Sequence, residues 1–159
     1  MRTEPSPLPF AAFPYGGRIQ LGRPKSGNGT SRTGYGLHLQ RLTGQTTCAY
    51  CGLDLTSSFE NWLMLSVDHV VPGAEARRLE IPIDLYEDAI NLALCCLSCN
   101  GFGNRYKCTT ERQAISSIET FCELRDQCFR ERFGLLAQRR LLELDMFRQS
   151  PWTIGSGLD

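Results

Sequence analysis

The sequence lacks an apolar run that could cross a membrane. A spanning helix needs roughly eighteen or more consecutive apolar residues, and no such run occurs in the 159 residues. The first 17 residues, MRTEPSPLPFAAFPYGG, contain four prolines, where a secretion signal needs an uninterrupted apolar segment. We therefore expect no membrane partner and predict a cytosolic protein.

The chain also lacks net charge and any strong bias of composition. Lys and Arg number 17, as do Asp and Glu, and 42% of the residues are hydrophobic. These values are close to the averages of soluble proteins, so nothing marks the whole chain as disordered or fibrous. The length suits one domain of ordinary size with tails, and no internal repeat is present.

The charges are nevertheless distributed unevenly. Residues 1–47 carry six Arg or Lys against one Glu, which gives a net charge of plus five. Residues 48–108 carry four basic against eight acidic residues, or minus four, and the remainder carries seven against eight. A basic arm of this kind either follows a phosphate backbone or simply keeps the protein solvated, and charge alone does not choose between the two.

The pattern of residues predicts an α+β fold. Residues 1–35 are rich in Pro, Gly, Ser and Arg, which predicts an irregular basic arm. Residues 37–42, LHLQRL, form a helical turn or a short strand. A strand is predicted from Trp62 to Pro72 and a second within INLALCC, residues 90–96, with a long loop between them that has room for a helical turn.

Helices are predicted after residue 109. Thr110 and Gln113 have the spacing of a capping box, Gly134 is a plausible break, and a second helix covers about residues 135–147. We expect these helices to cover the core or a dimer partner. The domain scheme is an arm (1–35), a central domain (36–108), C-terminal helices (109–150) and a tail (151–159).

Eight cysteines include two Cys-x-x-Cys pairs. Cys48, Cys51, Cys96 and Cys99 match the ligand spacing of structural zinc, and the 44 residues between the pairs form an insert whose ends the metal would clamp. In a reducing cytosol this interpretation is preferred to a disulfide framework, and the alternative is a set of buried free thiols. Cys95 could replace Cys96 only by making a Cys-x-x-x-Cys pair.

The remaining single residues suggest less. Cys108, Cys122 and Cys128 have no partner at metal-ligand spacing and are interpreted as small core residues. His38 is left without a role. Tyr50 and Trp62 are expected to be core aromatics.

The motifs CAYCG, VDHVVP and INLALCCLSCN occur in this order. Together they resemble the zinc-bracketed branch of the HNH endonuclease family, over about Cys48 to Lys107. The resemblance implies a ββα-metal finger, in which two strands and a helix surround one divalent ion, clamped by a separate zinc site of four cysteines. It implies a phosphodiester hydrolase that cleaves DNA and leaves a 3′-hydroxyl and a 5′-phosphate.

The resemblance also implies roles for four residues. Asp68 would bind a catalytic Mg²⁺ or Mn²⁺, and His69 would take a proton from the attacking water. Asn91 would hold the loop by bonds to the backbone and so orient His69. Asn100 would be the second ligand of the ion. Carboxylate and amide oxygens are ligands that suit Mg²⁺ and Mn²⁺.

Several assignments stay open. Gly103 stands where this branch often has Lys, and a shifted alignment would make Asn104 the metal-side residue. Phosphate contacts are expected from four basic residues, which are otherwise surface charges: Arg77, Arg78, Arg105 and Lys107. His69 is either the nuclease base or a packed core histidine.

The function predicted from the sequence has three forms. One is a self-sufficient nuclease that nicks DNA, or cuts both strands as a dimer. Another is the nuclease subunit of a larger defence or mobile-element complex, in which a partner supplies specificity. The last is a catalytically silent zinc-fold module that binds nucleic acid.

Overall fold

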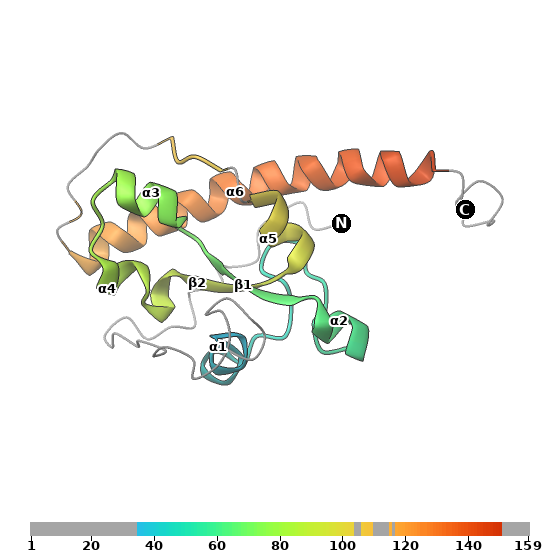
Figure 1. The fold of residues 1–159 in the computed structure, drawn as a ribbon, viewed down its shortest axis with the longest axis horizontal. Coiled ribbons are helices and arrows are strands. Elements are labelled where there is room, and N and C mark those ends of the chain that lie inside the picture. The colour runs from blue at the N-terminus through green and yellow to red at the C-terminus, as the bar shows by residue number, and fades with distance from the viewer. Residues whose placement is uncertain (1–34, 104–105, 110–114, 116, 151–159) are drawn as a thin grey trace.

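A computed structural model describes residues 35–103, 106–109, 115 and 117–150 (Figure 1). The predicted arm, apart from Tyr35, and the predicted tail lie outside these residues. So do Asn104, Arg105, Thr110 and Gln113.

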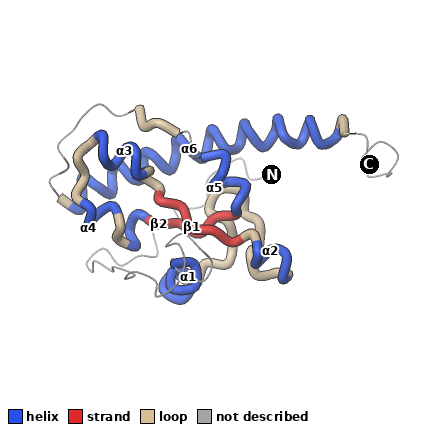
Figure 2. The backbone as a smooth tube through the Cα atoms, viewed as in Figure 1, coloured by secondary structure: helices blue, strands red, loops and turns tan. Residues whose placement is uncertain are grey.

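An antiparallel hairpin followed by a helix forms the centre of the fold (Figure 2). Strand β1 (Leu65–His69) pairs with β2 (Leu92–Cys96), and the register sets Leu65 opposite Cys96 and His69 opposite Leu92. Helix α5 (Leu97–Gly103) follows β2 directly. The predicted α+β class is confirmed, with a sheet of two strands among the described residues.

The first strand is shorter than predicted. Trp62 belongs to helix α2 (Phe59–Leu63), because the side chain of Ser58 accepts a hydrogen bond from the backbone N–H of Asn61 and caps the helix. At the other end, Pro72 precedes helix α3 (Gly73–Arg78). The apolar run therefore supplies a five-residue strand flanked by helices.

Short helices occupy the segments on either side of the hairpin. Residues 37–42 are helical, within α1 (Leu37–Thr43), which ends at Gly44 in a left-handed conformation (φ 65°). The long loop contains α3, then α4 (Ile83–Tyr86) and a 3₁₀ turn, η2 (Ala89–Asn91). The loop is thus more ordered than a single helical turn.

Among the described residues after 109, the chain forms one helix, α6 (Ile118–Arg148), and the predicted break at Gly134 is wrong. Ser117 and Thr120 form its capping box. Figure 1 shows the hairpin between α1 on one side and α6 on the other, with the end of α6 projecting past the body. No helix within the described ranges is both long enough and apolar enough to span a membrane.

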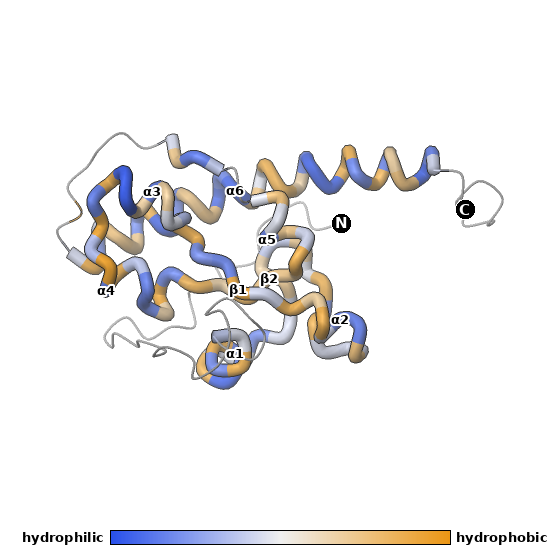
Figure 3. The backbone as a smooth tube through the Cα atoms, in the orientation of Figure 1, coloured by the Kyte–Doolittle hydropathy of each residue, from blue (hydrophilic) through white to orange (hydrophobic). Residues whose placement is uncertain are grey.

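The core lies where β1, β2 and the first half of α6 meet. Its fully buried side chains include Val67, Leu94, Phe121 and Phe129. The last turns of α6 carry exposed apolar residues between charged ones, which Figure 3 shows as alternating colours along that helix: Leu141, Leu142, Leu144, Met146 and Phe147. The first half of α6 therefore packs on the core, and its last turns expose apolar side chains.

Candidate functional site

Four thiols gather at one end of the hairpin. The sulfur atoms of Cys48, Cys51, Cys96 and Cys99 lie within 4.8 Å of one another, and the Cys51 and Cys96 sulfurs are 3.8 Å apart. Tetrahedral zinc with Zn–S bonds of about 2.3 Å places its sulfur ligands roughly 3.8 Å apart. The donor set and its spacing therefore fit a structural metal ion such as zinc.

Local backbone geometry aims the thiols at one point. The Cys48 turn closes with a bond of 2.9 Å from the Gly52 N–H to the Cys48 carbonyl, and Gly52 takes a left-handed conformation (φ 76°). The second pair spans the junction of β2 and α5, where the Cys99 N–H points at the Cys96 sulfur, 3.5 Å away. Amides that face the sulfurs favour thiolates, which are the form that binds zinc.

The clustered thiols share their protons unevenly. A hydrogen bond with Cys48 is the largest effect on two of them: it lowers the pKa of Cys51 and raises the pKa of Cys99. A metal ion replaces such shared protons when it binds.

Cys95 is not part of the cluster, which confirms the choice of Cys96. Cys95 lies opposite Ser66 in the register and is fully buried. Cys108, Cys122 and Cys128 are also buried and stand outside the cluster, as expected of small core residues.

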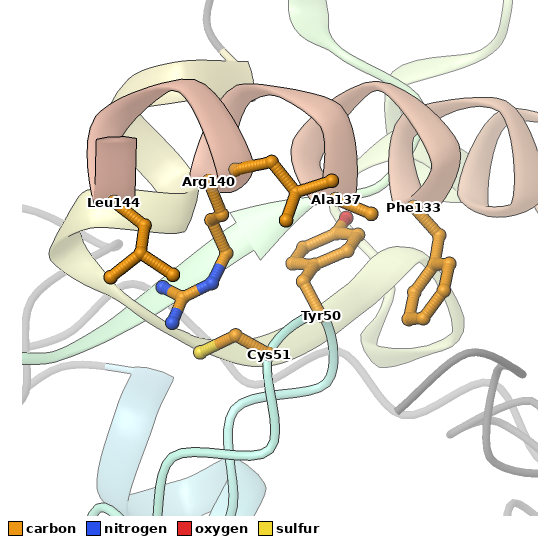
Figure 4. Close-up of a pocket in the computed structure, with 7 residues that line it drawn as sticks. Tyr50, Cys51, Phe133, Ala137, Arg140 and Leu144 are labelled. Carbon is orange, nitrogen blue, oxygen red and sulfur yellow. The ribbon is translucent and has the colours of Figure 1, made fainter. Parts of the chain in front are cut away.

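An open cavity of about 290 Å³ lies between the Cys48–Cys51 turn and α6. Figure 4 shows the ring of Tyr50 beneath Ala137 and the Cys51 sulfur facing the side of Arg140. Tyr50 is buried and its ring stacks on Phe129, as predicted for a core aromatic, whereas Trp62 is only half-buried and stacks on Phe59.

The predicted base, His69, ends β1 at the other end of the hairpin from the thiols. Its ring stacks on Tyr86 with the centroids 4.5 Å apart, and its Nε2 lies 3.4 Å from a carboxylate oxygen of Glu87. Its side chain is 13% exposed. His69 therefore has a carboxylate neighbour, an aromatic support and limited access to solvent.

Asn91 fixes the loop around His69. Its side chain is fully buried, accepts a bond from the Val71 N–H (2.9 Å), and donates to the carbonyls of Val71 (3.2 Å) and Tyr86 (2.9 Å). These bonds tie the residues after β1 to the end of α4, which carries the aromatic partner of His69.

Asp68 points to the other face of the strand, as alternation along a strand requires. Its carboxylate forms a buried ion pair with Arg132 of α6, with distances of 2.8 Å from Nη2 to Oδ1 and 2.7 Å from Nη1 to Oδ2. The hydroxyl of Tyr50 donates to Oδ2 as well. Burial and the nearby Asp68 charge raise the pKa of Tyr50 well above its usual range, so the phenol keeps its proton.

The predicted divalent-ion site does not fit this arrangement. Asn100, on α5, donates from its amide nitrogen to the Ser66 hydroxyl (2.9 Å), on the strand face that also carries Asp68. Both carboxylate oxygens of Asp68 are occupied by Arg132 and Tyr50, and Asp68 is 5% exposed.

The predicted phosphate contacts differ in their surroundings. Arg78 forms a salt bridge with Glu75, with 2.6 Å between Nη2 and Oε2, whereas Arg77 and Lys107 are exposed. A methyl group on Gly73 would touch both the Tyr86 hydroxyl and a guanidinium nitrogen of Arg77. Arg77 thus lies on the side of the molecule where Tyr86 stacks on His69, whereas Arg105 is outside the described residues. His38, on α1, is exposed.

Sequence patterns did not indicate Arg132, Glu87 or Tyr86. Arg132 is 64 residues from its partner Asp68, and a single arginine within a helical pattern normally indicates a solvated face. Its full burial is the signal that only the fold provides.

Comparisons with family models, with curated proteins and with solved structures find no match to this chain.

Proposed function

We propose that the chain is an HNH-type endonuclease that hydrolyses phosphodiester bonds of DNA. The observation that supports it best is the hairpin–helix unit: β1 ends in Asp68–His69, and four thiols stand at the opposite end of the hairpin. The order strand, strand, helix is that of a ββα-metal finger, and the bonds of Asn91 match the role that the resemblance implies for it.

His69 is the general base in this proposal. Its imidazole takes a proton from water, the water oxygen attacks phosphorus, and the bond from phosphorus to the 3′-oxygen breaks. The 3′-oxygen leaves as a hydroxyl after it gains a proton, and the phosphate stays on the 5′ side. Glu87, next to Nε2, holds the imidazole tautomer, and Tyr86 holds the plane of the ring.

Two metals belong to the proposal. Zinc is the ion of the four thiols, because sulfur ligands in a tetrahedron select it. The second ion that the sequence predicts, Mg²⁺ or Mn²⁺, would be held by Asp68 and Asn100, and it could bind only if Asp68 parted from Arg132. Such an ion would stabilise the negative charge that develops on the phosphate oxygens.

DNA is the proposed partner, with the basic residues of the N-terminal arm adding affinity that falls as salt rises. One site acts on one strand, so cleavage of both strands needs a homodimer or a partner protein. We place the enzyme in the cytosol, as the sequence predicts.

Two alternatives each have an observation in their favour. The exposed apolar residues of the last turns of α6 favour a nuclease subunit that docks on a partner. The ion pair of Arg132 with the Asp68 carboxylate favours a silent zinc module that only binds nucleic acid.

The test is nicking of supercoiled plasmid by zinc-loaded wild type, by His69→Ala and by His38→Ala as the matched histidine control. We expect nicking by wild type and His38→Ala with Mg²⁺ or Mn²⁺, and a loss of at least about a hundredfold in His69→Ala, the usual contribution of a general base. EDTA abolishes the reaction. Nicking that survives in His69→Ala overturns the proposal, and no nicking by wild type with or without candidate partners favours the silent module.

A further inference from the structure

A buried ion pair holds the carboxylate of the proposed metal site. Asp68 is 5% exposed and Arg132 is 2% exposed, and the guanidinium meets the carboxylate with two nitrogens on two oxygens. This fork-to-fork geometry is the strongest form of such a pair. It joins β1 to α6 at the residue that the proposed reaction needs.

Arg132 fills the space in front of Asp68 as well as neutralising it. Its Nη1 also donates to the carbonyls of His69 (3.0 Å) and Val70 (3.1 Å). A methyl group on Gly103, the last residue of α5, would collide with Nη2 of Arg132. The guanidinium therefore sits between β1, α5 and α6, on the face where Asn100 bonds to Ser66.

The charge of Arg132 is permanent. Burial opposes it, but the neighbouring groups of Tyr50 and Asp68 raise the pKa of Arg132 on balance, so the side chain stays cationic. A divalent ion needs free oxygen lone pairs, which Asp68 does not offer while Arg132 is in place. The fixed positive charge of Arg132 would also repel the ion.

From these contacts we infer that Arg132 closes the site by acting as the cation of Asp68, and that a divalent ion binds there only when the guanidinium moves away. The inference extends the proposed function and rests on it for the pairing of Asp68 with Asn100. It makes α6 the element that controls the metal, because Arg132 is carried on that helix.

The structure provides room for the guanidinium to move. Arg132 borders an open cavity of about 240 Å³ that Tyr106 and Leu136 also line, and its guanidinium already lies 5.7 Å from the Tyr106 ring centroid. Its Nε is buried without a hydrogen-bond partner among the described residues, so the closed position leaves one donor unsatisfied. A swing over the tyrosine ring would release Asp68 and keep the cation on an aromatic face.

The experiment measures Mn²⁺ binding by electron paramagnetic resonance to the zinc-loaded full chain. Wild type is compared with Arg132→Gln, with Gly103→Ala, and with each variant combined with Asp68→Asn. Gly103→Ala keeps the arginine and displaces only its end, so it covers the case in which Arg132→Gln fails to fold. Circular dichroism and zinc content report folding.

We expect both single variants to gain an Mn²⁺ site that disappears with Asp68→Asn. If the ion pair of Arg132 with Asp68 is formed in about nine molecules in ten or more, the gain in apparent Mn²⁺ affinity over wild type is about tenfold or greater. Wild type that binds Mn²⁺ through Asp68 as tightly as the variants overturns the inference, as do folded variants without an Asp68-dependent site.

Plasmid nicking by the same samples separates this inference from the proposed function. If Arg132→Gln and Gly103→Ala bind Mn²⁺ but do not nick DNA, the inference about Arg132 stands and the proposed nuclease function is contradicted. If wild type nicks DNA in a His69-dependent manner and all three proteins bind Mn²⁺ with equal affinity, the proposed function stands and the inference about Arg132 is wrong.

Discussion

Asn91 illustrates how one buried side chain determines the shape of this site. Its side-chain amide forms three hydrogen bonds with backbone groups: two with Val71, just after β1, and one with Tyr86, at the end of α4. Because Tyr86 stacks on His69, the same amide holds both the strand end and the support of the imidazole. An apolar replacement would leave these backbone groups buried without partners.

Replacing Asn91 by alanine should therefore lower the free energy of unfolding by about 3 kcal/mol, since each buried polar group left unpaired costs roughly 1–3 kcal/mol. Urea denaturation of the zinc-loaded protein measures the loss. The matched control is Asn61→Ala, whose amide bonds to Asp54 and Ser57 are exposed, and for which we expect a loss below about 1 kcal/mol. Equal losses in the two variants would contradict the structural role given to Asn91.

Some residues of the site can be predicted from the amino-acid sequence, and others cannot. The four zinc-type cysteines are predictable because a tight turn brings both members of a Cys-x-x-Cys pair to one side, whatever the rest of the fold does. Arg132 is not, because its position depends on how α6 crosses β1, which no local pattern encodes. The motif that contains Asp68 therefore gave no indication that its carboxylate is closed by an arginine.

At the level of elements, packing overrides local signals in α6. Its first half buries Phe121, Leu124 and Phe129 against the core, and Leu136 is buried beyond Gly134. A glycine inside a helix costs only about 1 kcal/mol, which is less than these contacts on both sides provide. The predicted break at Gly134 failed for this reason, whereas strand β2 was predictable from a short apolar run followed by a cysteine pair.

Gly134→Ala should raise the free energy of unfolding by about 0.5–1 kcal/mol, because alanine has the higher helix propensity and loses less entropy on folding. A methyl group at this position meets nothing within 4 Å. Gly52→Ala is the contrasting variant, since its left-handed backbone (φ 76°) disfavours a side chain, and it should destabilise. Urea denaturation compares the two. Destabilisation by Gly134→Ala would mean that the helix does bend there.

For the whole molecule, the thiol cluster joins parts of the chain that are distant in sequence. Cys48 and Cys51 lie before the hairpin, while Cys96 and Cys99 lie where β2 passes into α5. A metal ion at this point closes a loop that contains β1, α3, α4 and Asn91. The ion would thus stabilise the surroundings of His69 without touching them.

The thiol cluster should bind one zinc per chain, and its removal should lower the melting temperature by more than about 10 °C, because the binding energy of a structural zinc is also folding energy. A thiol-blocking titration with a colour reagent measures released zinc, and a thermal melt measures stability before and after chelation. Cys51→Ser should lose zinc and melt at the lower temperature without chelator. Cys95→Ser, a buried cysteine next in sequence to a ligand but outside the cluster, should keep its zinc. If Cys95→Ser loses zinc while Cys51→Ser retains it, the ligand set is different. If the wild type holds no zinc, the thiols are simply buried, and the loop around His69 must be held by Asn91 and by the ion pair of Asp68 with Arg132.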